Sequence, residues 1–306
     1  MSLSIYNIKK WTNMMLGKSI MHVNQDIGKS FTSGTISGYY NNLTDKVTML
    51  PELLDTESLP TFCLPEGRNI LFPVGIFQYG LGAYDLYLQS QDKRYKKKFM
   101  QCCQWAIDNQ EPSGAWDNFS FEYPQNPYGA MAQGEAASLL IRGFKETGDK
   151  KYINAAKKAI DFMLLPLDRG GTSLYTNNGG IMMCEFTHLP IVLNGWIFAW
   201  FGLYDYTIAT KDCGAYKAAT EQSERTIAQT LPMFTYSHWS RYDIKEKIAS
   251  PFYHRLHIAQ MQAMYKLTGN TIYAEFEKRW KKDYDNMLWK SVAFIRKAWQ
   301  KISEKE

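Results

Sequence analysis

The feature that most constrains the fold is a helical repeat with a tyrosine at a fixed point. Four apolar stretches each end in a short turn rich in Asp, Gly or Asn, and a tyrosine then opens a more charged stretch. By subtraction the four tyrosines are spaced 57, 64 and 57 residues apart: Tyr95, Tyr152, Tyr216 and Tyr273. This alternation is typical of stacked helix pairs with the apolar helix inside. The repeat predicts a mainly α-helical solenoid or (α/α) toroid.

Two loops between the predicted helix pairs are rich in glycine, proline and aromatic residues, at 109–129 and 167–186. The second predicts a short β-hairpin that turns at Asn178–Gly180. Loops at the mouth of the inner helices line the cleft of a helical toroid, and such loops carry function more often than the elements that they join. We therefore expect the functional residues there.

The N-terminal fifth of the chain lacks the repeat. Residues 1–30 are polar and weakly amphipathic, and residues 33–60 alternate weakly between polar and apolar, which favours irregular or hairpin structure. The sequence therefore predicts a helical or irregular N-terminal extension over 1–60, packed on a toroidal catalytic domain over 61–306. A chain of 306 residues is ample for one such core.

Charge and composition limit the partners. The net charge of +5 is well short of the balance typical of nucleic-acid-binding proteins, and no segment reaches transmembrane length. Five cysteines, odd in number and without metal-ligand spacing, predict free thiols in a reducing compartment. The N-terminus has charges where a signal peptide needs an apolar run, so a cytoplasmic location is expected. The sequence contains no dinucleotide motif, and neither a cofactor nor a metal is expected.

Three stretches resemble one enzyme family, the D-glucuronyl C5-epimerases, in their C-terminal catalytic region. They are "NPYGAMAQGEAASLLIRGF", "EFTHLPIVLNGWIFAWFGLYDY" and "LPMFTYSHWSRYDIKEK…FYHRLHIAQMQ", and "FPVGIFQYGLGAY" upstream adds a fourth. The resemblance covers roughly residues 38–285. It departs from the family where a β-domain is missing after "QYGL", where Phe186 replaces a tyrosine, and where the interval between Tyr242 and Tyr253 is short.

The resemblance implies epimerisation of D-glucuronate to L-iduronate within a heparosan-like acidic polysaccharide. It places the two catalytic groups at Glu185 and Tyr253, with Tyr242 as a third phenol in the cleft. This chemistry removes the C5 proton beside a carboxylate and returns a proton to the opposite face, so it needs an acid/base group on each side. Relatives in animals suggest a possible homodimer. The predicted substrate-binding residues are Arg241, His254, His257, Gln133, Asn194, Tyr128, Trp116 and Arg68.

Other interpretations of the same residues stay open. Tyr253 and His257 could be packing residues, although with Gln260 they share one face of a helix at i, i+4 and i+7. Trp116 and Tyr128 fit either stacking on sugar rings or ordinary packing, and Gln133 and Asn194 fit helix-end hydrogen bonding. A polysaccharide lyase shares the proton abstraction. A glycoside hydrolase needs two carboxylates. Phe186, in place of the family's tyrosine, favours a polysaccharide-binding protein without catalysis. The candidate hydrolase carboxylates are Glu135, Asp117, Glu122 and Glu185.

Overall fold

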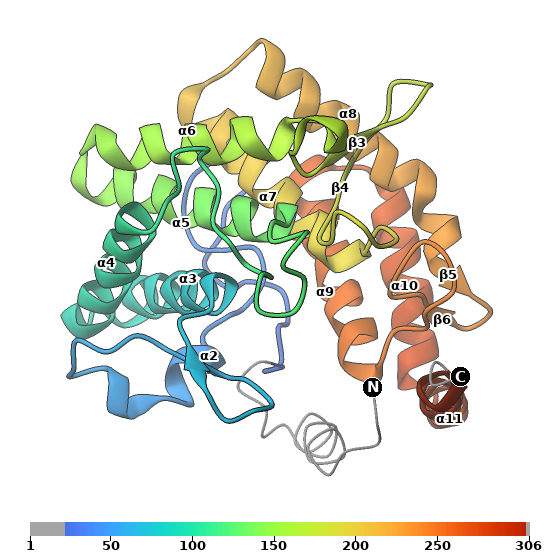
Figure 1. Cartoon of the computed structure of the whole chain (residues 1–306). Helices are drawn as coiled ribbons and strands as arrows, with labels where there is room; N and C mark the ends of the chain where they lie inside the picture. Colours follow the sequence, from blue (N-terminus) through green and yellow to red (C-terminus); the bar gives the residue numbers. More distant parts are fainter. Residues whose placement is uncertain (1–21, 304–306) are drawn as a thin grey trace.

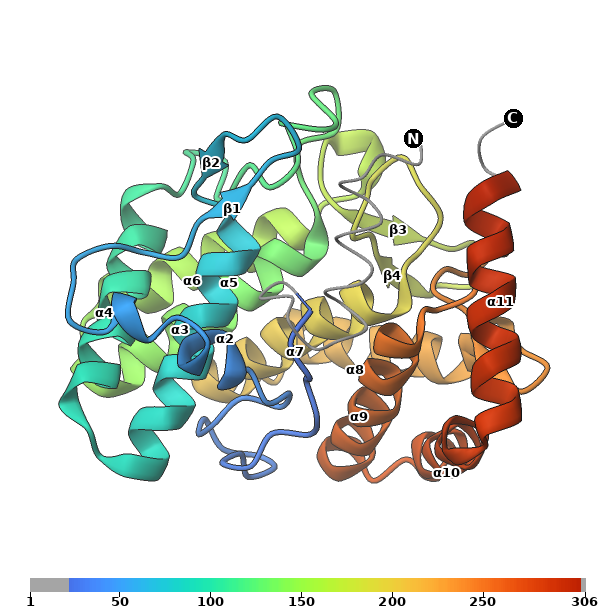
Figure 2. The same cartoon turned by 90° about the horizontal axis from the view of Figure 1, so that it is seen from below.

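The computed structural model describes residues 22–303, which form an incomplete ring of four helix pairs (Figures 1 and 2). The inner helices are α3 (Pro73–Ser90), α5 (Ala130–Thr147), α7 (Leu193–Thr210) and α9 (Pro251–Thr268). The outer helices are α4 (Lys93–Asp108), α6 (Lys150–Leu164), α8 (Ala215–Thr230) and α10 (Thr271–Asp285). A last helix, α11 (Met287–Ser303), stands at the edge of the molecule (Figure 2). The predicted (α/α) toroid is confirmed.

The turn inside each pair explains the position of the repeated tyrosine. In three pairs the inner helix ends on a left-handed residue, and the next side chain caps the outer helix. The capping residues are Asp92, Asp149 and Asn270. Each repeated tyrosine lies in the first turn of its outer helix, as predicted.

The central inner helices α5 and α7 pack with their backbones in contact. A Cβ atom added to Gly134 would lie 2.5 Å from the Cα atom of Ala199, and one added to Gly202 would lie 2.2 Å from the carbonyl oxygen of Gly134. Since real side chains do not approach so closely, both positions require glycine. This contact fixes α5 against α7, and their first turns hold the candidate site.

Short hairpins and turns lie at the end of the ring where the inner helices begin. The predicted hairpin is confirmed, with Gly179 in the left-handed region at φ +84°. The hairpin strands are β1 (Phe62–Cys63) with β2 (Asn69–Ile70), β3 (Ser173–Tyr175) with β4 (Ile181–Met183), and β5 (Thr235–Tyr236) with β6 (Trp239–Ser240). One-turn 3₁₀ helices lie at Pro51–Leu53, Leu167–Arg169 and Leu231–Phe234.

The N-terminal segment crosses the ring between its first and last pairs (Figures 1 and 2). It begins against α9, where Arg255 pairs with Asp26 at 2.9 Å, and it reaches α3 through the short helix α2 (Asp45–Thr48). Tyr39 and Tyr40 on this segment are fully buried in the same core as the inner helices. Residues 22–60 thus pack on the toroid, while the prediction for 1–21 lies outside the described residues.

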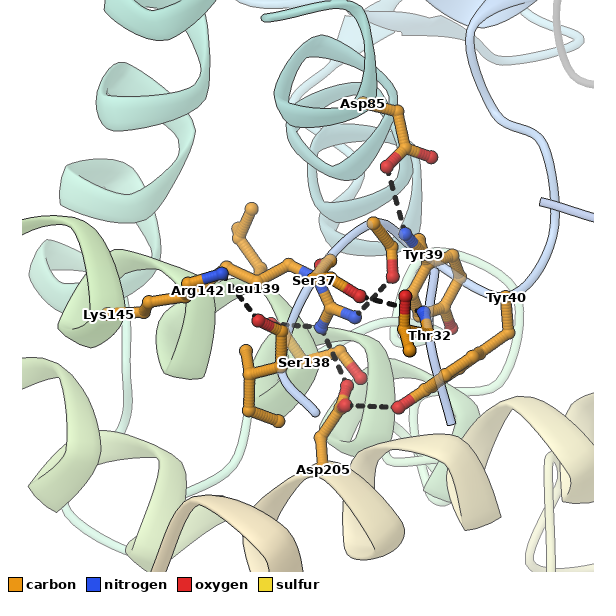
Figure 3. Close-up of polar contacts among 12 residues, drawn as sticks. Thr32, Ser37, Tyr39, Tyr40, Asp85, Ser138, Leu139, Arg142, Lys145 and Asp205 are labelled. Atoms are coloured by element: carbon orange, nitrogen blue, oxygen red, sulfur yellow. Dashed lines mark hydrogen bonds and ion pairs between the residues drawn. The ribbon is translucent and has the colours of Figure 1, made fainter. Parts of the chain in front are cut away.

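A buried ion pair joins this segment to α5 and α7 near the far ends of those helices (Figure 3). The Arg142 guanidinium is 2.7 Å from Asp205, and both side chains are fully buried. Arg142 also donates to the carbonyl oxygens of Ser37, Gly38 and Ser138, and the Tyr40 hydroxyl donates to Asp205 at 2.5 Å. Arg142, which belongs to a stretch that resembles the family, therefore holds the N-terminal segment in place.

Two expectations concern the cysteines and the apolar length of the helices. All five cysteines are free thiols, as predicted. Within residues 22–303, no helix combines the length and the apolar character that a membrane crossing requires.

Candidate active site

The candidate site lies where the inner helices begin, and two loops reach it. The loop that follows β4 carries Glu185, and its Cys184 carbonyl accepts a hydrogen bond from the first N–H group of α5 at 2.8 Å. The loop that follows β6 carries Tyr242, whose carbonyl accepts from the first N–H group of α7 at 3.2 Å. The helices leave these N–H groups unpaired within themselves. Both loops are therefore anchored by the helix ends that they cover.

Glu185 is a nearly buried carboxylate, 9% exposed. It sits against the first turn of α7, where a Cβ atom on Gly195 would lie 2.2 Å from Glu185 Oε2. Among the described residues, Oε2 has no hydrogen-bond partner. Burial raises the pKa of Glu185 to about 8. At this pKa the carboxyl group can both gain and lose a proton near neutral pH.

Tyr242 and Tyr253 form a pair of phenols, both half-buried, next to this carboxylate. Their ring centroids are 4.8 Å apart. Burial raises the pKa of each tyrosine above its usual range, and the negative charge of Glu185 adds to the rise at both. A hydrogen bond with Tyr242 acts in the opposite direction on Tyr253. The structure thus brings together the three residues expected to be catalytic.

Behind Tyr253, a buried serine joins the two predicted histidines. Ser240 Oγ is 2.8 Å from Nδ1 of both His254 and His257. The Ser240 N–H also donates to His254 Nδ1, so His254 Nε2 carries the proton and donates to the Trp280 carbonyl at 3.1 Å. Burial lowers the pKa of His254 to about 3 and that of His257 well below its usual value. Both rings are therefore neutral at pH 7, and neither offers a positive charge to a substrate carboxylate.

The two histidines differ in whether a ring nitrogen lacks a hydrogen-bond partner among the described residues. Both ring nitrogens of His254 are hydrogen-bonded, to Ser240 and to the Trp280 carbonyl, and the ring centroid lies 3.8 Å from that of Trp239. His254 therefore has a supporting role in the packing next to Tyr253. His257 Nε2 is buried and lacks a partner among residues 22–303. Asn194 Oδ1 and Gln260 Oε1 share this property, and Gln260 Nε2 donates to the Asn194 carbonyl at 3.1 Å. A sugar-binding role for His257 and Asn194 stays a prediction.

Three predicted residues lie in the 109–129 loop or against it. Gln133 bonds to both the N–H and the carbonyl of Trp116, at 3.2 and 3.3 Å. The Trp116 ring is 1% exposed and donates to Ala106, so the expected stacking platform at Trp116 is not formed. Tyr128 is half-buried, donates to Glu111 at 2.7 Å, and meets Phe162 edge to face. Gln133 therefore acts as a loop anchor.

Two predicted arginines contact residues other than Glu185. Arg68 is exposed in the β1–β2 turn and pairs with Glu66 at 3.6 Å. The Arg241 guanidinium lies over the Tyr236 ring, 5.5 Å from its centroid, and donates to the Lys245 carbonyl at 2.6 Å. Arg241 lies beside α11, and its neighbour Tyr242 packs on Tyr253.

The carboxylates that a hydrolase would need are not paired across an open cleft. Asp117 and Glu122 are exposed on the 109–129 loop. Glu135 is fully buried and accepts from Gln78 at 2.8 Å, and burial raises its pKa to about 8. The charge of Glu185 adds to this rise, so the two carboxyl groups are near one another, but Glu135 does not reach the surface.

Sequence reasoning missed several residues around the site. Phe186 packs on Phe119, with centroids 4.6 Å apart, and on Tyr123 at 5.9 Å. Tyr123 lies in the loop singled out for its aromatic residues, and that composition was the available signal. No sequence signal pointed to Ser240, because its spacing from His254 and His257 does not show that its hydroxyl contacts both rings.

The fold and the site define a member of the (α/α) toroid class. A solved structure of similar fold is the cellobiose 2-epimerase from Spirochaeta thermophila DSM 6192, with a TM-score of 0.51 and 10% identity over 92% of this chain and 86% of that chain. At this identity the likeness concerns the fold alone. The family model described as D-glucuronyl C5-epimerase C-terminus matches residues 110–282. The chain belongs to this family.

The matches to two relatives each cover only part of the relative's length. An uncharacterized protein of Methanocaldococcus jannaschii is 30% identical over 173 residues, which are 53% of this chain and 56% of that protein. The D-glucuronyl C5-epimerase of Caenorhabditis elegans is 23% identical over 216 residues, which are 61% of this chain and 35% of the enzyme. The matches thus span about half and about one third of these relatives.

Proposed function

We propose that this chain epimerises D-glucuronate residues to L-iduronate at C5 within a heparosan-like acidic polysaccharide. One observation carries the proposal: a buried carboxylate without a hydrogen-bond partner among the described residues, Glu185, lies close enough to the phenols of Tyr242 and Tyr253 to raise the pKa of both. All three residues lie inside the segment that matches the epimerase family. The family relation and the site chemistry support the same type of reaction.

In this proposal Glu185 is the base. It takes the C5 proton of glucuronate, and the electron pair of the broken C–H bond moves into the substrate carboxyl group as an enediolate. A base works best when its pKa is near the operating pH, and the pKa of about 8 for Glu185 meets this condition. The unprotonated fraction increases as the pH rises to about 8, and activity should increase with it.

Tyr253 acts from the other face. Its raised pKa keeps the phenol protonated, so it donates its proton to C5 as the electron pair returns and a new C–H bond forms. Tyr242, hydrogen-bonded to Tyr253, stabilises the phenolate that results. Glu185 then loses its proton to solvent and Tyr253 regains one, which restores the enzyme and balances the reaction.

The experiment is incubation of the protein with heparosan in deuterated water, followed by NMR of the polymer. The expected result is deuterium at C5 together with new iduronate signals. Glu185→Gln and Tyr253→Phe should each reduce the rate by about 10² to 10⁴, and Tyr265→Phe, on the same helix and 43% exposed, serves as the control. Folded protein that leaves C5 without deuterium would contradict the proposal.

The same sample distinguishes the alternatives. A lyase would cleave the chain and raise the ultraviolet absorbance of unsaturated uronates, and a hydrolase would shorten the chain without that absorbance. Binding that is unchanged by Glu185→Gln and Tyr253→Phe, without exchange or cleavage, would identify a non-catalytic polysaccharide-binding protein.

A further inference from the structure

A groove lies between α11 and the β5–β6 hairpin with the loop after it, and that loop also carries Tyr242. This groove has a volume of about 520 Å³, a size typical of small-molecule sites. The side chains that matter for its chemistry are Tyr236, Arg241, Glu246, Arg296 and Trp299. Gln300 fixes α11 here, because it accepts from the Ile248 N–H at 3.1 Å and donates to the Glu246 carbonyl at 3.2 Å.

The groove combines exposed aromatic faces with guanidinium groups. Trp299 is 73% exposed and Tyr236 is 40% exposed. The guanidinium groups of Arg241 and Arg296 lie 5.5 and 5.2 Å from the centroid of the Tyr236 ring. Arg241 Nε is buried without a hydrogen-bond partner among the described residues. Aromatic rings stack on the C–H faces of sugars, and guanidinium groups bind carboxylates in two-pronged fashion.

Charge complementarity selects an acidic ligand. Residues 236–303 contain 13 Lys and Arg against 6 Asp and Glu, a net charge of +7, while the whole chain has +5. The excess positive charge of the protein therefore lies in the C-terminal part of the chain, which includes the groove and its two arginines. Such a surface attracts a polyanion over long distances. Within the lining of the groove, Glu246 is the acidic residue that opposes the two arginines.

The groove adjoins the segment that carries Tyr242. Arg241 lines the groove and is bonded directly to Tyr242, and the Lys297 ammonium on α11 lies 6.0 Å from the centroid of the Tyr242 ring. A polysaccharide bound in the groove therefore lies next to one of the three candidate catalytic residues. Helix α11 lies outside the segment that matches the family, residues 110–282.

We propose that this groove is a second subsite, which binds a further uronate residue of the same acidic polysaccharide by stacking on Trp299 and Tyr236 and by ion pairing with Arg296 and Arg241. The choice of polymer rests on the proposed function. The subsite increases affinity for long chains and contributes no group to proton transfer.

The test is affinity electrophoresis of the full chain in gels that contain heparosan, with neutral dextran as the comparison polymer. Arg296→Glu and Trp299→Ala should each weaken retardation by heparosan roughly fivefold or more, which corresponds to about 1 kcal/mol. Two controls keep the change in charge or size but lie outside the groove lining: Arg225→Glu on α8 and Leu288→Ala on α11. Glu246→Gln should strengthen retardation, because it removes the opposing carboxylate.

Running the assay in the Tyr253→Phe protein separates this proposal from the proposed function, because binding is then measured without turnover. In the active enzyme, the groove variants should raise KM for long heparosan and leave kcat, and the rate on fragments too short to reach the groove, unchanged. Retardation by heparosan that Arg296→Glu and Trp299→Ala leave intact would overturn the subsite, as would equal retardation by dextran. Absence of C5 exchange with the expected pattern of retardation would overturn only the epimerase proposal.

Discussion

Buried charged groups at the two ends of the inner helices differ in their hydrogen bonding. At the far end, Arg142 and Asp205 are fully buried, and carbonyl groups and a phenol complete their hydrogen bonds (Figure 3). At the near end, Glu185 is almost as buried, yet its Oε2 has no partner among the described residues. Ten residues of α7, about 15 Å of helix, separate Gly195 beside Glu185 from Asp205.

This difference indicates different tasks. A buried pair with complete hydrogen bonding fixes one arrangement of the chain, here the N-terminal segment across the ring. A buried group left unpaired costs free energy in the resting protein, and such strain is typical of sites that meet a ligand or exchange a proton. The same helices therefore carry a scaffold at one end and a reactive site at the other.

The largest expected effect is at the paired end. Arg142→Ala should lower the free energy of unfolding by about 3–5 kcal/mol, because it leaves Asp205 buried without its partner. Urea unfolding measures the change. In the Asp205→Asn background the same substitution should cost clearly less, and an equal cost in both backgrounds would show that the pair is not the source of the effect.

At the unpaired end, removal of the charge should stabilise the protein. The pKa of Glu185 rises from 4.5 in the unfolded chain to about 8 in the folded one, so the carboxyl favours folding less and less as the pH increases from 4.5 to 8. The full shift corresponds to about 5 kcal/mol, and we expect roughly half after relaxation. Glu185→Gln should therefore raise the melting temperature at pH 9 and change it little at pH 4.5.

A matched control is Glu122→Gln on the exposed loop, which should change stability equally little at both pH values. A melting temperature that Glu185→Gln lowers more at pH 9 than at pH 4.5 would mean that the charged carboxylate has a stabilising partner.

The contact of Glu185 with α7 can be tested by crowding it. Gly195→Ala should destabilise the protein by about 1–3 kcal/mol, because the new Cβ atom would overlap the Glu185 side chain. Urea unfolding of single and double variants provides the measurement. In the Glu185→Gly background, which also removes the Glu185 Cβ atom 2.7 Å from the new one, most of the cost should disappear, and a cost that persists would place the clash elsewhere.

The smallest expected effect concerns the support behind Tyr253. Ser240→Ala removes the hydroxyl between His254 and His257 and should cost about 1 kcal/mol of unfolding free energy. If the hydroxyl only positions the two histidine rings, the rate of proton exchange at C5 should fall modestly and its pH profile should stay unchanged. A shift of the profile would instead indicate that the histidines exchange protons with the reaction.

The fold was largely predictable because its signals are local. Each helix pair has its own apolar stretch, cap and tyrosine, so the pattern could be recognised at Tyr95 and again at Tyr152, Tyr216 and Tyr273 without knowledge of distant contacts. The hairpin around Gly179 was predictable for the same reason, since its turn needs a residue with positive φ. The path of residues 22–44 across the ring was not, because its partners lie far away along the chain.

The candidate site was predictable only in part. Glu185, Tyr242 and Tyr253 were identified through the family resemblance, and the structure brings them together. The direction in which a side chain points was not predictable: Trp116 turns into the core, and Arg241 turns toward α11. No spacing rule distinguishes a tryptophan that lines a cleft from one that supports it.

The sequence by itself determined the ring of helix pairs, the hairpin and the identity of three candidate catalytic residues, because periodicity, turn residues and family motifs are written along the chain. Only the tertiary structure decided that Glu185 Oε2 has no hydrogen-bond partner among the described residues, that His254 and His257 are neutral, and that a groove with two arginines lies between the β5–β6 hairpin and α11. These properties depend on burial and on contacts between distant segments, and the free energy of a charge depends on its surroundings more than on its neighbours in sequence.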